Sequence, residues 1–211
     1  MAKPFKVFGI GLNKTGTSSL KIALRRLGYD HAPREMRLVT NYYNGKMAPI
    51  FEYSELHESF EDWPWPLVYK EIYARYGDNA RYILTARKST DVWLKSIKSH
   101  SERVKGRDIR RKIYGYPYPH GVEKNYAAVY ENHNAEVREF FTVEPRKHLF
   151  ADLCWEQGDG YLELCRLLGE PLLSMDFPHN NNAKKSNPNS DLVRENANKI
   201  REQLQSVNGD I

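Results

Sequence analysis

The hydrophobic and polar positions near the start of the chain predict a strand, a loop and a helix in immediate succession. Residues 6–10 form a short apolar run of β-prone residues, and Gly9 and Gly11 allow the backbone to turn. Leucines then recur at helical spacing behind three small hydroxyl residues. The predicted apolar stripe consists of Leu20, Leu24 and Leu27, with Gly28 placed to end the helix.

Similar patterns continue along the chain. Residues 81–86 and 146–153 predict further strands. Helices are expected at 51–60, 67–76, 91–105, 123–141 and 160–168, and a last one at 190–207, capped by Ser190. This succession predicts an α/β fold with a central parallel sheet flanked by helices. In such sheets ligands bind at the carboxyl ends of the strands.

Length and charge narrow the picture. The 211 residues fit one domain covering 1–211. The chain has 32 Lys and Arg against 27 Asp and Glu, a net charge of +5 that suits anionic ligands without requiring nucleic acid. Residues 95–112 alone contain eight Lys or Arg and two acids. That run is equally typical of a solvated helix face.

The two cysteines, Cys154 and Cys165, have no clustered histidines, so they indicate neither a metal site nor a disulfide framework. No apolar run reaches the roughly 18 residues needed to span a membrane. The N-terminus leads directly into a strand without a signal-peptide pattern. We therefore expect a cytoplasmic protein without membrane or nucleic-acid partners.

The loop before the first helix has the composition of an anion-binding site. The N–H groups at a helix start favour phosphate or sulfate. The candidate ligands are Lys14, Thr15, Gly16, Thr17 and Ser18. A nucleoside-triphosphate P-loop places its Lys after the last Gly, whereas Lys14 precedes Gly16 by two positions. The dinucleotide fingerprint also fails, and a turn that merely starts a helix remains the alternative.

A second candidate anion ligand is Arg87, which follows the strand predicted at 81–86. NTPases place a magnesium-binding Asp at the corresponding strand end. A guanidinium there favours a second anionic group, since its planar donors match a phosphate. The alternative is an Arg that only caps the strand or pairs with Asp91.

Two segments together resemble the sulfotransferases that use 3′-phosphoadenosine 5′-phosphosulfate (PAPS). KTGTSSL resembles their 5′-phosphosulfate loop, and RYILTARKSTDVWLKS resembles their 3′-phosphate segment. The resemblance implies that Arg87 and Ser96 bind the 3′-phosphate. Two departures are visible: Ser96 follows Arg87 by nine positions instead of eight, and Ser89 replaces a common Pro.

Weaker similarities extend over most of the chain. RRLGY, DWPWPLVYKEI, YENHNAEVREFF and the run from CWEQGDGYLELCRLLGEP to FPHNNN are similar to short sulfotransferases with an FPHxN segment. Phe177, Pro178, His179 and Asn181 match that segment. The family resemblance implies a P-loop-NTPase-like fold, PAPS as donor, 3′,5′-adenosine bisphosphate as product and no metal.

The resemblance also implies roles in in-line sulfuryl transfer. Lys14 and the loop donors would stabilise the leaving group. Asp62 is our candidate for the base that takes the acceptor proton, since Trp63 and Trp65 can desolvate it and raise its pKa. Glu61 and His57 are the substitutes, and capping of the following helix is the structural alternative for Asp62.

We expect residues 101–145 to form a helical and loop insertion on the acceptor side. Tyr114, Tyr116, Tyr118 and His120 could stack on a small-molecule or glycan acceptor of acidic or aromatic character. A loop packed over the core is the alternative. Oligomeric state is not predicted.

Two other function classes compete with sulfuryl transfer. One is a magnesium-dependent small-molecule kinase or NTPase with a degenerate P-loop. The other is a non-catalytic protein that binds RNA or polyanions through residues 95–112, with strong salt dependence and no turnover.

Overall fold

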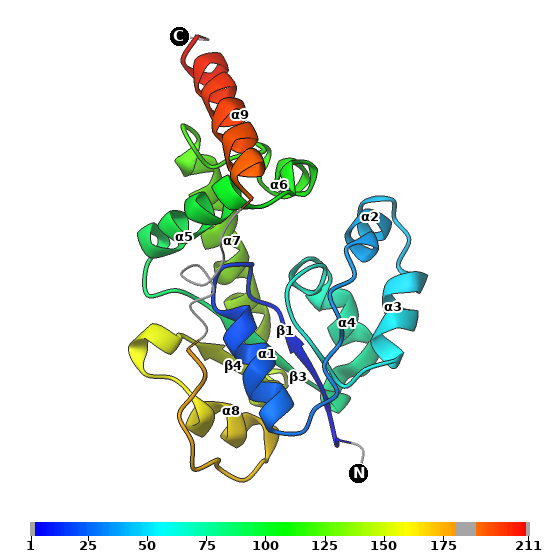
Figure 1. Ribbon diagram of the computed structural model, residues 1–211. Coiled ribbons are helices and arrows are strands. Elements are labelled where there is room, and N and C mark those ends of the chain that lie inside the picture. The colour runs from blue at the N-terminus through cyan, green and yellow to red at the C-terminus, as the bar shows by residue number, and fades with distance from the viewer. Residues whose placement is uncertain (1–2, 180–188, 210–211) are drawn as a thin grey trace. The chain divides into compact units, whose positions relative to one another are not determined.

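The computed structural model describes residues 3–179 and 189–209 and contains a four-stranded parallel sheet (Figure 1). The strands are β1 (Lys6–Gly9), β2 (Ser59–Phe60), β3 (Ala80–Thr85) and β4 (Phe150–Leu153), in the order β2-β1-β3-β4. All three pairings are parallel. Helices flank this sheet, so the predicted α/β class is confirmed.

The helices among the described residues account for most of the remaining chain. They are α1 (Thr17–Arg26), α2 (Arg37–Tyr43), α3 (Ala48–Glu55), α4 (Tyr69–Tyr76), α5 (Thr90–Arg103), α6 (Arg107–Tyr114), α7 (Glu123–Phe141), α8 (Tyr161–Leu168) and α9 (Ser190–Gly209). Short 3₁₀ turns η1 (Trp65–Leu67), η2 (Gly77–Asn79), η3 (Lys147–Leu149) and η4 (Trp155–Gln157) join them.

The described residues divide into two compact units. The first comprises residues 3–88 and 134–179, and the second comprises residues 89–133 and 189–209. The division falls within α7, so that each unit includes part of that helix. The single domain predicted over 1–211, with its insertion at 101–145, stays a prediction.

In the first unit, helices cover both faces of the sheet. On one face α1 and α8 pack their leucines against Val7, Ile83 and Leu153. On the other, α2, α3, α4 and the end of α7 pack around Phe8 and Tyr82. The buried rows on both faces explain why β1 and β3 are almost continuously apolar.

Helix α1 has the limits that its sequence predicts. Leu20 and Leu24 are fully buried, and Gly16 precedes the helix in a left-handed conformation with φ 99°. Gly28 follows the last turn with φ 86°, and its N–H donates to the Arg25 carbonyl. A side chain would be strained at this φ, which is why glycine ends the helix here.

Several expected elements differ from the structure. Residues 51–60, expected as one helix, contain the end of α3 and the strand β2. A two-residue strand is too short to produce an alternating pattern, so the sequence did not predict β2. The strand expected at 146–153 is shorter, because η3 precedes β4. Helices α2 and α6 were not predicted as separate elements.

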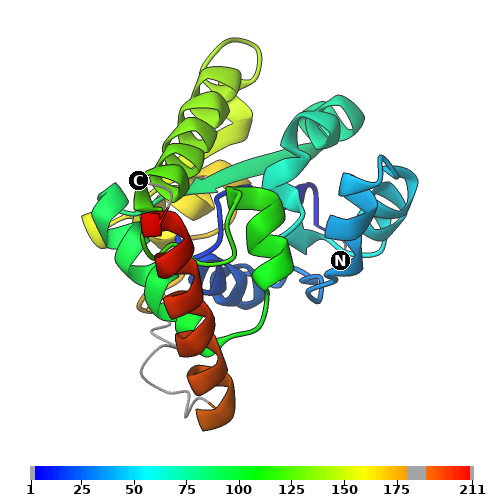
Figure 2. The same cartoon turned by 90° about the horizontal axis from the view of Figure 1, so that it is seen from above.

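The second unit is a helical assembly of α5, α6, α9 and the first part of α7. Trp93 stacks on Tyr130 with ring centroids 4.5 Å apart, and Tyr114 stacks on Tyr126 at 4.3 Å. Helix α9 lies beside α5 (Figures 1 and 2). The last helix therefore starts at Ser190, as its sequence predicts, and completes this unit.

Candidate functional site

The candidate site of the first unit lies where the connections of two neighbouring strands diverge. Strands β1 and β3 are adjacent, but the chain continues from β1 toward β2 and from β3 toward β4, on opposite sides. Ligands of open α/β sheets bind at such a switch point, outside the carboxyl ends of the strands. The predicted anion-binding loop follows β1, and Arg87 follows β3.

A buried hydroxyl pair joins the two strand ends. Thr15 Oγ1 donates to the Leu12 carbonyl at 2.6 Å and lies 2.6 Å from Thr85 Oγ1. A Cβ on Gly11 would lie 2.3 Å from the Thr85 carbonyl oxygen, so only glycine permits this approach. The Thr15 hydroxyl is thus engaged inside the protein, and its predicted ligand role would fall to its backbone N–H.

The turn into α1 is also shaped by a long-range contact. The Trp155 indole N–H donates to the Gly16 carbonyl at 3.2 Å. A Cβ on Gly16 would lie 2.4 Å from Trp155 Cδ1. Thr17 is buried and Ser18 is half-buried at the first turn of α1. The indole therefore holds the start of the helix in position.

Lys14 and Asp62 have an unusual backbone in common. In the described part of the chain they are the two non-glycine residues with positive φ, 71° and 64°. This conformation costs about 1 kcal/mol or more for such residues and concentrates at functional sites. Lys14 belongs to the loop after β1, and Asp62 follows β2, its neighbour in the sheet. Both residues predicted to be catalytic therefore lie at the carboxyl-terminal ends of neighbouring strands, on the same side of the sheet.

The Arg87 guanidinium is bound on both sides. Its Nη1 donates to the Lys14 carbonyl at 3.1 Å. Nε and Nη2 donate to the Glu156 carboxylate at 3.0 and 2.6 Å. Arg87 thus pairs with Glu156, which follows β4, and it connects the loop after β1 to that turn.

The Asp62 carboxyl is largely buried and has few hydrogen-bond partners among the described residues. Its side chain is 17% exposed, and Oδ2 lies 3.5 Å from Arg34 Nε. Oδ1 is buried without a hydrogen-bond partner among the described residues. Trp63 and Trp65 are buried beside it in the chain, and η1 has no side-chain cap. The Asp62 side chain is therefore not the cap of the following turn.

The pKa of Asp62 is raised to about 6, mainly by burial and then by the neighbouring Glu61 charge, whereas the Arg34 charge lowers it by less. Glu61 itself pairs with Lys21 at 3.3 Å and has its Oε2 buried without a partner in the part of the chain described. A carboxylate of this pKa is ionised at pH 7 and is still able to take up a proton. This is the chemistry of a general base.

His57, the other candidate for the base, lies at the amino-terminal end of the strands, opposite to the end where Asp62 lies. It precedes β2, whereas Asp62 follows that strand. Its carbonyl accepts a hydrogen bond from Lys6 Nζ at the start of β1, and its Nδ1 lies 2.8 Å from Asp30 Oδ2. His57 is thus separated from the loop that contains Lys14 by the length of the strands.

The predicted 3′-phosphate ligand Ser96 lies half-buried on α5 in the second unit. Its role stays a prediction. Ser89, which stands where a Pro is common, caps α5 by accepting a hydrogen bond from the Val92 N–H at 3.3 Å. Of the FPHxN segment, Phe177 packs on Trp155 with centroids 4.3 Å apart. Asn181 lies outside the described residues.

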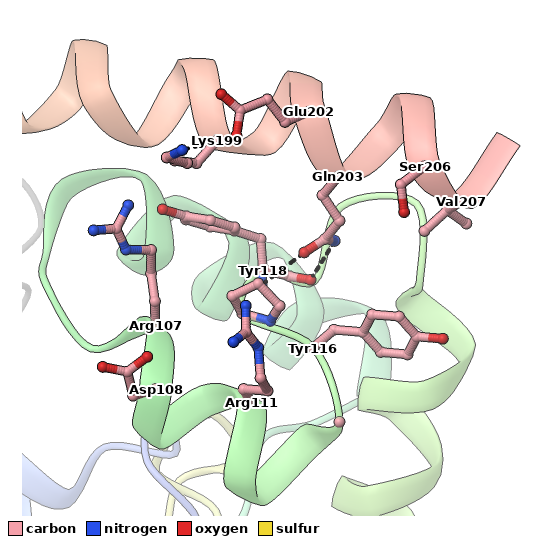
Figure 3. A pocket seen from close by; sticks show the side chains of 12 residues that line it. Arg107, Asp108, Arg111, Tyr116, Tyr118, Lys199, Glu202, Gln203, Ser206 and Val207 are labelled. Carbon is pink, nitrogen blue, oxygen red and sulfur yellow. Dashed lines mark hydrogen bonds and ion pairs between the residues drawn. The ribbon is translucent and has the colours of Figure 1, made fainter. Parts of the chain in front are cut away.

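The tyrosine loop of the second unit is mostly packed inside it. Tyr114 and Tyr118 are buried, and the Tyr118 hydroxyl donates to Asn196 Oδ1 at 2.7 Å. Gln203 of α9 bonds the loop backbone at Tyr118 (Figure 3). Tyr116, which is only partly buried, and Tyr118 line a cavity of about 560 Å³ between the loop, α6 and α9. Only part of the loop is therefore available to a ligand.

Three residues that shape the site were not singled out from the sequence. Thr85, Trp155 and Glu156 come from the ends of β3 and β4 and contact the loop or Arg87. Their position directly after buried strands is the signal that could have indicated them, because parallel strands bring their carboxyl ends together.

Residues 3–179 and 189–209 contain no cluster of three His, Cys, Asp or Glu side chains that could hold a metal ion. No helix in these residues has the length and hydrophobicity required to cross a membrane. Cys154 and Cys165 are both free.

A family model described as a sulfotransferase domain matches residues 6–186. The match includes the loop after β1, Asp62, Arg87 and Glu156. No curated protein matches the chain.

Proposed function

Because the chain belongs to the sulfotransferase domain family, we propose that it is a PAPS-dependent enzyme that transfers a sulfuryl group to a hydroxyl or amine of an acceptor. The observation that carries this proposal is the position of Lys14 and Asp62. Both have positive φ, and they follow the carboxyl-terminal ends of two adjacent strands. A cation and a base are the two groups that metal-free sulfuryl transfer requires.

The donor set of the first unit fits the two anionic ends of PAPS. Lys14 and the start of α1 would hold the 5′-phosphosulfate. Arg87 would hold the 3′-phosphate. The role of Ser96, which belongs to the second unit, stays an expectation from the family resemblance. When bound, PAPS supplies the sulfuryl group and leaves as 3′,5′-adenosine bisphosphate.

Lys14 places a positive charge beside the helix start, where negative charge grows on the leaving phosphate. Interactions that strengthen in the transition state increase the rate more than uniform binding does. Asp62 takes the proton of the acceptor, because its buried carboxyl has one oxygen without a partner in the described part and a pKa of about 6. Burial and, after it, the charge of Glu61 keep that pKa raised.

The test is calorimetric titration with 3′,5′-adenosine bisphosphate and, separately, with Mg-ATP. The first titration is repeated with EDTA. Tight binding of the bisphosphate that EDTA leaves unchanged, with little response to Mg-ATP, is the expected result. Preference for Mg-ATP would replace the proposal with a kinase, and binding of neither would leave the polyanion-binding alternative.

The acceptor is proposed to be a small molecule or glycan of acidic or aromatic character, and the protein to be cytoplasmic. The basic residues of α6 and the partly exposed Tyr116 support this choice of acceptor. Screening of phenols, amines and acidic sugars for PAPS-dependent product formation tests it. Fractionation of cells that produce the full chain tests the location.

A further inference from the structure

Glu156 forms a bidentate ion pair with Arg87, the residue that the proposed function assigns to the 3′-phosphate. Its carboxylate accepts hydrogen bonds from Arg87 Nε and Nη2 and from the Lys88 N–H, at 3.0, 2.6 and 3.1 Å. The bidentate geometry is the one in which guanidinium also binds phosphate. In the described structure a carboxylate of the protein thus takes the position in which Arg87 would receive an anion.

Most of the N–H groups of the Arg87 guanidinium already donate hydrogen bonds within the protein. A guanidinium has five N–H bonds. Two go to Glu156 and one goes to the Lys14 carbonyl. A phosphate that approaches Arg87 must therefore displace the carboxylate or share a cation whose charge is already neutralised. In either case the negative charge of Glu156 opposes phosphate binding.

The Glu156 carboxylate can leave the Arg87 guanidinium while the turn that contains Glu156 stays in place. The side chains of Arg87 and Glu156 are 23% and 30% exposed, so water reaches the pair. The neighbouring Trp155 is buried and is held by the Gly16 carbonyl and by Phe177. The turn is thus fixed by Trp155, while the side chain of Glu156 is accessible to water.

We propose that Glu156 is a specificity-determining residue of the donor site, whose carboxylate competes with the 3′-phosphate of the nucleotide for the Arg87 guanidinium. The inference rests on the proposed function, because it takes Arg87 as the 3′-phosphate ligand. Glu156 stabilises Arg87 in the absence of nucleotide, and it limits how tightly the bisphosphate product is retained. The adenosine and 5′-phosphate contacts do not depend on it.

The test compares two nucleotides and two variants by calorimetry. Glu156→Gln removes the charge with little change in shape, and 5′-AMP lacks the 3′-phosphate. The variant is expected to bind 3′,5′-adenosine bisphosphate about tenfold more tightly than the wild type. Its affinity for 5′-AMP should be unchanged. The readout is the affinity for 3′,5′-adenosine bisphosphate divided by the affinity for 5′-AMP. A merely structural role of Glu156 would change both affinities together and leave this ratio unchanged.

Asp152→Asn is the matched control, since Asp152 forms a comparable pair with Arg138 at 2.6 Å. It should leave both affinities unchanged. In an Arg87→Ala background the effect of Glu156→Gln should disappear, because the competition requires the guanidinium. Thermal denaturation of each variant confirms folding.

The outcomes separate the two proposals. A wild type that discriminates between the nucleotides, with a ratio that is unchanged or lower in Glu156→Gln, overturns the competition and leaves the sulfotransferase proposal intact. A lower ratio would make Glu156 a group that orients Arg87. A wild type that binds both nucleotides equally would remove Arg87 from the 3′-phosphate, and the role of Glu156 with it.

Discussion

The hydroxyl oxygens of Thr15 and Thr85 lie 2.6 Å apart, fully buried between the loop after β1 and the end of β3. Gly11 contacts the same Thr85 through its backbone. The loop that contains Lys14 is thus shaped by a neighbouring strand as well as by its own glycines. Its geometry should be sensitive to changes in residues far away in the sequence.

Thr85→Val should lower the free energy of unfolding by about 1 kcal/mol, because it removes one hydrogen bond from a buried hydroxyl that keeps its bond to Leu12. Chemical denaturation measures this. Thr142→Val is the control, since Thr142 is exposed and bonds only within its own turn in the described part of the chain. A Thr85→Val variant as stable as the wild type would mean that the pair contributes nothing.

Gly16→Ala should destabilise the protein and prevent bisphosphate binding. The new Cβ would lie 2.4 Å from Trp155 Cδ1, and the residue has φ 99°. Gly158 has the same φ, and a Cβ added there would have no described neighbour within 4 Å. Gly158→Ala should therefore cost about 1 kcal/mol from backbone strain alone, and Gly16→Ala roughly 2 kcal/mol more from the clash.

Denaturation curves and calorimetry of the two glycine variants separate strain from contact. Only Gly16→Ala should affect bisphosphate affinity. Equal stability losses in both variants would show that Trp155 yields to the added methyl group.

Asp62→Asn should reduce turnover about a hundredfold or more, with bisphosphate affinity unchanged, since the amide cannot accept the acceptor proton. In the wild type, kcat/KM should rise with pH around an apparent pKa of about 6. The assay uses an acceptor that the wild type sulfonates. Full turnover in the variant would exclude Asp62 as the base and direct attention to Glu61.

The same group predicts a dependence of stability on pH. The pKa of Asp62 is raised from 3.8 to about 6, so the native carboxyl binds a proton between these values when the unfolded chain has lost it. The free energy of unfolding should therefore decrease as pH rises through this window. Asp62→Asn should remove that decrease, whereas the exposed Asp176→Asn should not. Denaturation at pH 4 and pH 7 provides the comparison.

Lys14→Ala should lower kcat about a hundredfold, because it removes the cation beside the leaving phosphate. The exposed Lys46→Ala is the control for loss of charge. Initial rates at saturating PAPS separate kcat from KM. A variant with weaker PAPS binding and normal kcat would place Lys14 in binding and remove it from the transition state.

The sequence by itself determined the local elements of the site. The glycines and hydroxyls before Leu20 predicted the loop and α1, and Gly28 predicted its end, because these features act within one or two turns of chain. The position of Arg87 after an apolar run likewise indicated a strand end. The order of these motifs was enough to indicate the sulfotransferase family that the family model matches.

Only the tertiary structure decided which strand ends meet. Strand β2 has two residues, too few for a periodic signal, yet it places Asp62 beside β1. Glu156 is 69 positions from Arg87, and Trp155 is 139 positions from Gly16. Such contacts follow from strand order, which local hydrophobic periodicity does not encode. For that reason the sequence alone located both segments that are predicted to bind anions, whereas their connection through Thr85, Trp155 and Glu156 became visible only in the fold.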